Sequence, residues 1–205
     1  NQMSALFDDP DAFIKASADP DIRRRLGVQA PTLEGFLMPD TYFFDQRPTP
    51  REAVERMASQ FERRFAELLA LYPLPSGYDR DAVIVVASLV EEEAKVEEER
   101  PLVAAVIYNR LKKSIPLSMD STLQFALNKY GQRMMDEDKE VDSPYNTYKN
   151  AGLPPGPICN PGIASLRAAL DPAHENYLYF VSNADGRTHT FSKTLEEHNR
   201  AVARF

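Results

Sequence analysis

Three adjacent carboxylates are the residues best placed to do chemistry: Glu91, Glu92 and Glu93. They directly follow residues 82–90, which carry no charge and only one hydroxyl group. Such a segment carries an acid from a hydrophobic core to the edge of a surface or cleft. Partial burial there disfavours the charged carboxylate and raises its pKa, as a general acid requires. The simpler alternative is that the three glutamates form a solvated helix face.

The segment that positions these glutamates has the pattern of a helix over residues 81–95. Asp79 can cap its N-terminus, although the β-branched run inside the segment would also suit a buried strand. On a helix, Glu91 shares a face with the small residues Ala87 and Ser88. Small side chains on that face leave room for a ligand or another backbone to approach.

Other catalytic chemistries find little support in the sequence. The histidines are His174, His189 and His198. None belongs to an HExxH or comparable pairing, and Cys159 alone can form neither an internal disulfide nor a cysteine metal cluster. Serine-nucleophile elbows and glycine-rich phosphate loops are missing from the sequence, so we predict no metal and no cofactor. Carboxylate chemistry remains, and glycosidic cleavage fits it, with Asp40 and Asp120 available as the second carboxylate of a conventional glycosidase.

The surrounding elements are predicted to be mostly helical. Residues 49–52 match a capping box with Pro50 at the first helical position, and an amphipathic helix follows until Pro73. Another helix is expected to begin at Pro101, and Thr122 is expected to cap a short one.

The C-terminal part adds a small sheet to these helices. Asn160 is expected to cap a helix that precedes two strands, at residues 177–182 and 188–191. The turn between the strands predicts a hairpin, and a capping box at residues 194–197 predicts a final helix. The predicted class is therefore α+β, mostly helical, with a small β-sheet.

A rigid loop is expected at residues 143–162, which contain five prolines and three glycines. This loop is either a wall of a binding site or a well-packed connector. The aromatic-rich residues 32–44 pose a similar choice between lining a sugar site and packing between domains.

The charge of the chain excludes one class of partner. A formal net charge of −7 and an isoelectric point near 5.1 argue against nucleic acid, since phosphate binding needs a basic face. The one basic cluster, residues 23–25, is more simply a helix surface. No apolar run is long enough for a transmembrane helix. Because the chain starts at Asn1 rather than Met, we expect that an upstream segment is missing.

Four ordered segments resemble one known family, the YceG-like (MltG) endolytic murein transglycosylases. They are LEGFLMPDTYFF, ASLVEEEAKVEEERPLVAAVIYNRL, SPYNTYKNAGLPPGPICNPGIASLRAAL and NYLYFVSNADGRTHTFSKTLEEHN. In that family an α+β catalytic domain follows a smaller LysM-like domain and an N-terminal membrane anchor. The resemblance implies that residues 46–205 are the catalytic domain. Residues 1–45 are then part of the smaller domain or the link from it.

The resemblance also implies roles for particular residues. The family's catalytic glutamate follows an Ala-Ser-[Ile/Leu]-[Ile/Val] segment, which Ala87–Val90 matches, so Glu91 is the expected catalytic residue and Glu93 is expected to be structural. The expected substrate-binding residues are Tyr145, Asn146, Thr147, Tyr148, Ser88 and Asp120. Many members carry a glutamine-containing segment where this chain has residues 117–120, so a sugar contact by Ser118 is not implied.

The expected reaction is cleavage of peptidoglycan strands between N-acetylmuramic acid and N-acetylglucosamine. Glu91 would protonate the glycosidic oxygen and then deprotonate the C6 hydroxyl, which closes a 1,6-anhydro ring without water. An intramolecular nucleophile is favoured by its effective molarity, so a second carboxylate is not required. The alternatives are a hydrolytic muramidase that uses Asp40 or Asp120, and a non-catalytic glycan-binding module.

The family also suggests a setting for this activity. Cell-wall synthases are the suggested protein partners, and termination of nascent glycan strands is the suggested role. The full-length protein is expected to be anchored in the cytoplasmic membrane and to face the periplasm or cell wall, through an anchor that this chain lacks.

Overall fold

The computed structural model describes residues 7–9 and 11–204. Its first helices are α1 (Ala12–Ser17), α2 (Pro20–Arg25), α3 (Pro50–Leu69) and α4 (Arg80–Glu93). They are followed by η2 (Glu97–Glu99), α5 (Arg100–Lys112), α6 (Asp120–Leu127), η3 (Asp136–Glu140) and α7 (Ile163–Leu170). The chain ends in the strands β1 (Tyr179–Ser182) and β2 (His189–Ser192) and the helix α8 (Leu195–Val202).

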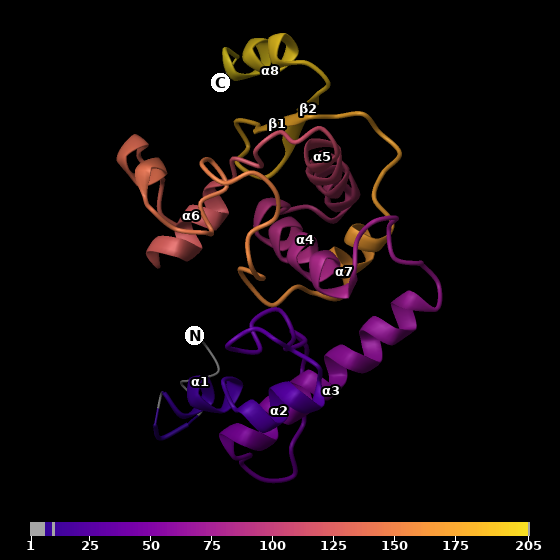
Figure 1. The fold of residues 1–205 in the computed structure, drawn as a ribbon, viewed down its shortest axis with the longest axis vertical. Coiled ribbons are helices and arrows are strands. Elements are labelled where there is room, and N and C mark those ends of the chain that lie inside the picture. The colour runs from indigo at the N-terminus through magenta and orange to yellow at the C-terminus, as the bar shows by residue number, and fades with distance from the viewer. Residues whose placement is uncertain (1–6, 10, 205) are drawn as a thin grey trace.

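Helix α4 lies at the centre of the upper part of the molecule, against α5, α6 and α7 (Figure 1). All residues from 83 to 90 are buried, which explains why this segment carries no charge. The Asp79 side chain accepts a hydrogen bond from Ala82 N at 2.8 Å, and the helix ends at Glu93 because Ala94 is extended. The predicted helix is confirmed, and the three glutamates occupy its last turn.

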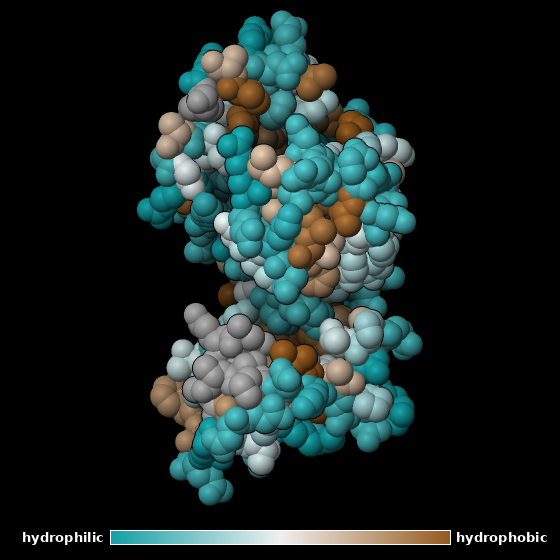
Figure 2. Space-filling view, turned by 90° about the vertical axis from the view of Figure 1, so that its left-hand side faces the viewer, coloured by the Kyte–Doolittle hydropathy of each residue, from teal (hydrophilic) through white to brown (hydrophobic). Residues whose placement is uncertain are grey.

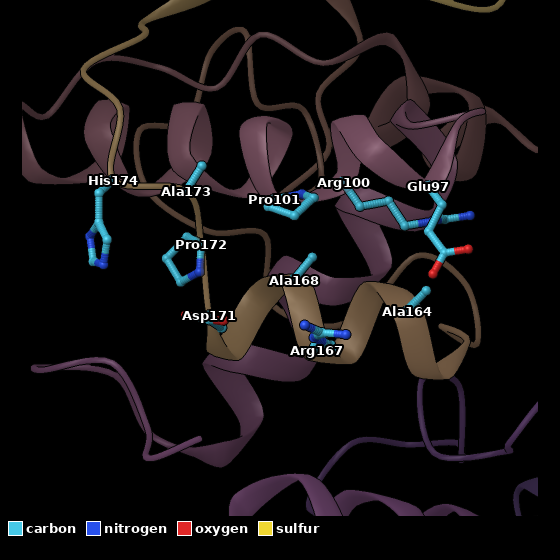
Figure 3. A pocket seen from close by; sticks show the side chains of 10 residues that line it. All are labelled: Glu97, Arg100, Pro101, Ala164, Arg167, Ala168, Asp171, Pro172, Ala173 and His174. Atoms are coloured by element: carbon cyan, nitrogen blue, oxygen red, sulfur yellow. The ribbon is translucent and has the colours of Figure 1, made fainter. Parts of the chain in front are cut away.

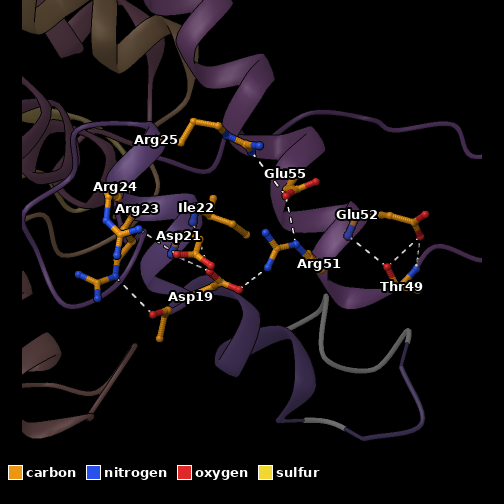
Figure 4. A network of polar contacts seen from close by, with 11 residues as sticks. Asp19, Asp21, Ile22, Arg23, Arg24, Arg25, Thr49, Arg51, Glu52 and Glu55 are labelled. Atoms are coloured by element: carbon orange, nitrogen blue, oxygen red, sulfur yellow. Dashed lines mark hydrogen bonds and ion pairs between the residues drawn. The ribbon is translucent and has the colours of Figure 1, made fainter.

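Helix α3 extends from the lower part of the molecule towards the upper part, and α1 and α2 lie at its lower end (Figure 1). The predicted capping box at its start is confirmed, since Thr49 and Glu52 cap each other (Figure 4). Arg51, in the first turn, pairs with both Asp19 and Glu55, and Asp19 also caps α2. Ion pairs and caps thus join the N-terminal helices to α3.

The basic cluster at residues 23–25 is part of this helical surface, as predicted. Arg23 donates hydrogen bonds to two backbone carbonyls, Arg24 pairs with Asp21 at 3.0 Å, and Arg25 pairs with Glu55 at 3.5 Å (Figure 4). Each guanidinium therefore has a partner within the chain.

The segment before α3 is fastened to the loop at residues 143–162. Asn160 Oδ1 accepts hydrogen bonds from Gly35 N at 2.8 Å and Leu37 N at 3.0 Å, while its Nδ2 donates to Glu34. Gly35 has a φ of +89°, and a Cβ there would lie 2.3 Å from Pro157 Cγ. Only glycine fits this close approach.

Two predicted helix caps are wrong. The N-cap of α7 is Gly162 rather than Asn160, because the Asn160 side chain is used in the contacts just described. Thr122 lies inside α6, whose N-cap is Met119, and its hydroxyl donates to the Met119 carbonyl and contacts Thr147 Oγ1. In both cases tertiary hydrogen bonds take the side chain that local sequence offered as a cap.

The predicted hairpin is confirmed. β1 and β2 are antiparallel, with Tyr179 opposite Ser192 and Ser182 opposite His189, and α8 packs on both strands. The α+β class, mostly helical with a small sheet, is therefore confirmed. Among the described residues, no helix is both long and apolar enough to cross a membrane.

The molecule is elongated and narrows between its lower and upper parts, and the face in Figure 2 is largely hydrophilic. The predicted boundary between residues 45 and 46 stays a prediction, and residues 1–6 of the N-terminal segment lie outside the described residues. The upper part, built around α4, holds the three glutamates.

Candidate active site

The three glutamates at the end of α4 enter different surroundings, because successive helical residues are rotated by about 100°. Glu91 faces α7, Glu93 faces α6, and Glu92 is exposed. The three adjacent glutamates therefore have three different environments in the structure.

Glu91 is bound to the start of α7. One oxygen, Oε2, accepts hydrogen bonds from Ser165 Oγ at 2.7 Å, Gly162 N at 3.1 Å and Arg100 Nη1 at 3.3 Å. Arg100 also donates to Ser165 Oγ, which ties the donors together. The three donors converge on this one oxygen, so the contacts fix the Glu91 side chain against the start of α7.

Glu93 has the property that the sequence predicts for a general acid at this position. Burial raises its pKa most, and the nearby charges of Asp120 and Glu92 raise it further. Two groups act in the opposite direction: Ser121 Oγ donates to Glu93 Oε1 at 2.6 Å, and His189 contributes positive charge. The net effect is a raised pKa, which favours a protonated carboxyl group.

Glu93 and Asp120 line two cavities. The first, of about 280 Å³, lies towards the hairpin and is also lined by Lys95, Gln124 and His189. The second, of about 200 Å³, is also lined by the residues Arg110, Leu117, Ser118, Met119, Tyr148 and Phe180. A chain of sugars that occupied both cavities would pass directly over the two carboxylates.

The structure brings together two of the predicted binding residues. Tyr148 Oη donates to Asp120 Oδ1 at 2.6 Å, so the loop at residues 143–162 contacts the start of α6 at the edge of the second cavity. Burial, followed by Asp120, raises the pKa of Tyr148, which keeps its hydroxyl protonated as a donor. Asp40, the other candidate second carboxylate, is exposed and bound to Thr41 N and Gln60 Nε2.

The other predicted binding residues have partners within the protein. Asn146 is buried and donates to the carbonyls of Lys139 and Val141, while Thr147 Oγ1 accepts from Met119 N. Their substrate-binding role stays a prediction, and their contacts hold the loop against its neighbours.

Two further predicted residues, Tyr145 in this loop and Ser88 on α4, also have contacts within the protein. Ser88 is buried, donates to the Val85 carbonyl at 2.7 Å and accepts from Ile158 N at 3.1 Å. The Tyr145 ring lies 4.7 Å from the Phe125 ring. Sugar contacts by these two residues also stay predictions.

Sequence reasoning did not select Ser121, His189 or Arg110 for this site. His189 is separated from Glu93 by nearly a hundred residues, and only the hairpin brings it to the cavity. Ser121 directly follows Asp120, and this position next to a predicted site residue was the one signal in the sequence that could have identified it. Among the described residues, no cluster of histidine, cysteine and acidic side chains is suited to a metal ion.

A third cavity lies apart from these residues, between the start of α5 and α7 (Figure 3). Its volume is about 410 Å³, with Arg100 and Glu97 at one end and His174 at the other. None of the predicted site residues lines it. Its one link to the glutamates is the contact between Arg100 and Glu91.

Comparisons with protein families, named proteins and solved structures give consistent matches. A model described as the YceG-like family matches residues 3–204. A Bacillus subtilis (strain 168) protein named endolytic murein transglycosylase is 41% identical over 173 residues, covering 84% of this chain and 48% of that protein. A protein of the same name from Streptococcus pneumoniae serotype 2 (strain D39 / NCTC 7466) is 31% identical over 176 residues, covering 83% of this chain and 32% of that protein.

A solved structure agrees with these sequence relatives. The crystal structure of a yceG-like protein from Listeria monocytogenes superposes with a TM-score of 0.82 and 33% sequence identity, covering 94% of this chain and 67% of that one. The chain spans about half of the Bacillus relative and about a third of the Streptococcus relative.

Proposed function

Because the chain belongs to the YceG-like family, we propose that it is the catalytic part of an endolytic lytic transglycosylase acting on peptidoglycan. The substrate is the glycan strand, cut between N-acetylmuramic acid and N-acetylglucosamine with formation of a 1,6-anhydro end. The names of the relatives support the reaction class. The two cavities that share Glu93 and Asp120 support a polymeric substrate that occupies more than one sugar site beside the carboxylates.

The observation that carries the proposal is the environment of Glu93. This carboxyl group has a raised pKa, lines both cavities and keeps one oxygen towards Ser121. We therefore propose Glu93 as the general acid and base. The sequence motif favours Glu91 instead, but its Oε2 is committed to Ser165, Gly162 and Arg100. In this proposal Glu91 positions α7 against α4.

The reaction needs one carboxyl group in two successive roles. Protonated Glu93 gives its proton to the glycosidic oxygen as the bond from that oxygen to C1 breaks. The C6 hydroxyl of the same muramyl residue then attacks C1 and returns its proton to Glu93. Acid–base help of this kind supplies about 10²–10⁴-fold in rate, and the intramolecular nucleophile contributes through its effective molarity. Asp120 accepts a hydrogen bond from Tyr148 and lines both cavities with Glu93, and in this proposal its charge stabilises the positive charge that develops at C1.

One observation favours a second candidate, a hydrolytic muramidase. Asp120 lies beside Glu93 in both cavities, as a second carboxylate of a glycosidase would. In that reaction a water molecule replaces the C6 hydroxyl, and ordinary reducing ends appear in place of anhydro ends.

Mass spectrometry of the products separates the two reactions. We expect purified peptidoglycan incubated with this chain to yield fragments that end in 1,6-anhydro-N-acetylmuramic acid. Reducing-end products alone would overturn the transglycosylase reaction in favour of the muramidase. Binding without any cleavage, across the whole pH range, would indicate a non-catalytic glycan-binding module.

The proposal includes a setting for the full-length protein. Family resemblance supports cell-wall synthases as partners, termination of nascent strands as the role, and a membrane anchor outside this chain that places the enzyme on the cell-wall side.

A further inference from the structure

Glu99 and His189 form a closely joined pair beneath the first cavity. His189 Nδ1 lies 2.7 Å from Glu99 Oε2, and the His189 backbone N–H donates to Glu99 Oε1 at 2.9 Å. The His189 side chain is only 6% exposed, and the Glu99 side chain is 13% exposed. A carboxylate that binds both the ring and the backbone of one histidine fixes the ring orientation and places a proton on Nδ1. His189 also lines the first cavity, so the ring that Glu99 holds borders that space.

The position of this pair in the fold points to Glu93. His189 is the first residue of β2, and it lines the same cavity as Glu93, while the Phe180 ring packs edge-on against the imidazole with centroids 5.3 Å apart. The charged groups around the imidazole are Glu92, Glu93 and Lys95 from the end of α4, Asp120 from α6 and Glu99 from η2. The Lys95 ammonium donates to the Gly186 carbonyl at 2.9 Å, so its charge is directed to the hairpin turn.

Catalysis creates a charge problem at this place. When Glu93 gives up its proton, it becomes a carboxylate beside Asp120 and Glu92, both of which oppose its ionisation. The carboxylate must nevertheless persist until the C6 hydroxyl returns a proton. A cation in the cavity wall would remove this repulsion.

Resting on the proposed role of Glu93, we infer that His189 and Glu99 are positioning residues, in which the imidazolium held by Glu99 stabilises the carboxylate that Glu93 becomes during the reaction. No proton moves to or from His189. The Glu93 proton goes to the leaving oxygen as the C1–oxygen bond breaks, and the C6 hydroxyl proton returns to Glu93 as the C1–O6 bond forms. The charge of His189 indeed opposes the effect of burial, which is the largest influence on the pKa of Glu93.

Two substitutions separate this role from a structural one. H189N keeps a side-chain N–H that can donate to Glu99 but removes Nε2 and its charge. E99Q keeps the size of Glu99 but removes the negative charge beside the imidazole. Glu99 binds His189 and does not line the cavity that His189 shares with Glu93, so Glu99 acts through the imidazole.

The decisive measurement is the titration of the Glu93 carboxyl carbon by ¹³C NMR, which does not depend on turnover. We expect its pKa to rise in H189N, to rise in E99Q, and to rise no further in the double variant than in H189N alone. An unchanged Glu93 titration in a folded H189N protein would overturn the inference, and so would effects that add in full. If H189N does not fold, as judged by circular dichroism, the E99Q titration decides in the same way.

Activity gives an independent readout. A higher pKa of Glu93 shifts the alkaline limb of the pH–rate profile to higher pH. Weaker stabilisation of the carboxylate lowers kcat at the optimum by about tenfold. H174N is the matched control, because His174 is exposed and lies in the cavity between α5 and α7. Wild-type protein without anhydro products would contradict the proposed function, whereas the NMR titration alone would still support or overturn the pair.

Discussion

At the scale of single residues, two carboxylates only two positions apart on α4 have different surroundings. Glu91 accepts three hydrogen bonds from the region of α5 and α7, whereas Glu93 is partly buried beside α6 and the hairpin. The sequence predicts an acid with a raised pKa at the end of this helix. It cannot select between the two, because the contacts of Glu93 come from residues 28 or more positions away.

A first prediction concerns Ser121, whose hydroxyl donates to Glu93. S121A removes a hydrogen bond that stabilises the ionised carboxylate. The pKa of Glu93 therefore rises, and the alkaline limb of the pH–rate profile shifts to higher pH. Loss of such a bond typically costs about 0.5–1.5 kcal/mol, so we expect the rate at the optimum to fall roughly two- to tenfold. The pH–rate profile tests this, with S59A, an exposed serine on α3, as the control. A shift of the alkaline limb to lower pH would contradict this prediction.

At the scale of elements, caps and periodicity were predictable where the partners are local. The capping boxes at Thr49 and Thr194 and the hairpin depend on neighbouring residues, and all are confirmed. The caps assigned to Asn160 and Thr122 failed, since these side chains bind segments that only the fold brings near. His189 was not predicted for the same reason, because only the fold brings it to the cavity beside Glu93.

The fastening of the N-terminal segment gives a second prediction. G35A places a Cβ 2.3 Å from Pro157 Cγ at a φ of +89°, so we expect both backbone strain and a steric clash. Gly77 is the matched control, because its φ is +86° and nothing lies within 4 Å of an added Cβ. G77A should cost about 1–2 kcal/mol from strain alone, and G35A about 1–3 kcal/mol more. Equal melting temperatures for the two variants would contradict the close packing.

At the scale of the whole molecule, the proposed acid opposes stability. The pKa of Glu93 is raised above its ordinary value of 4.5, so burial of Glu93 is tolerated best below that pH. Stability is then lost as the pH rises through the folded-state pKa, because the unfolded chain releases the proton more readily.

The third prediction follows from this sign. E93Q replaces an ionisable group with a neutral one of similar size, so we expect it to unfold at a higher temperature than the wild type at pH 7 and to lose this advantage near pH 4. For a chain of this length, each kcal/mol regained raises Tm by about 2–4 °C. Thermal unfolding at the two pH values tests it, with E98Q, at an exposed glutamate of η2, as control. A lower Tm for E93Q at pH 7 would show that the carboxylate stabilises the fold.

The most direct test of the central claim compares E91Q and E93Q as a matched pair, by the rate of release of anhydro-muramyl products from purified peptidoglycan. We predict that E93Q lowers this rate by at least about 10²-fold while its fold is kept, since the general acid and base is lost. We predict that E91Q retains measurable turnover and has a lower Tm, because the negative charge that binds Arg100, Ser165 and Gly162 N is lost and only one acceptor oxygen is left. Full activity in E93Q together with inactive, well-folded E91Q would contradict this assignment and return the catalytic role to Glu91.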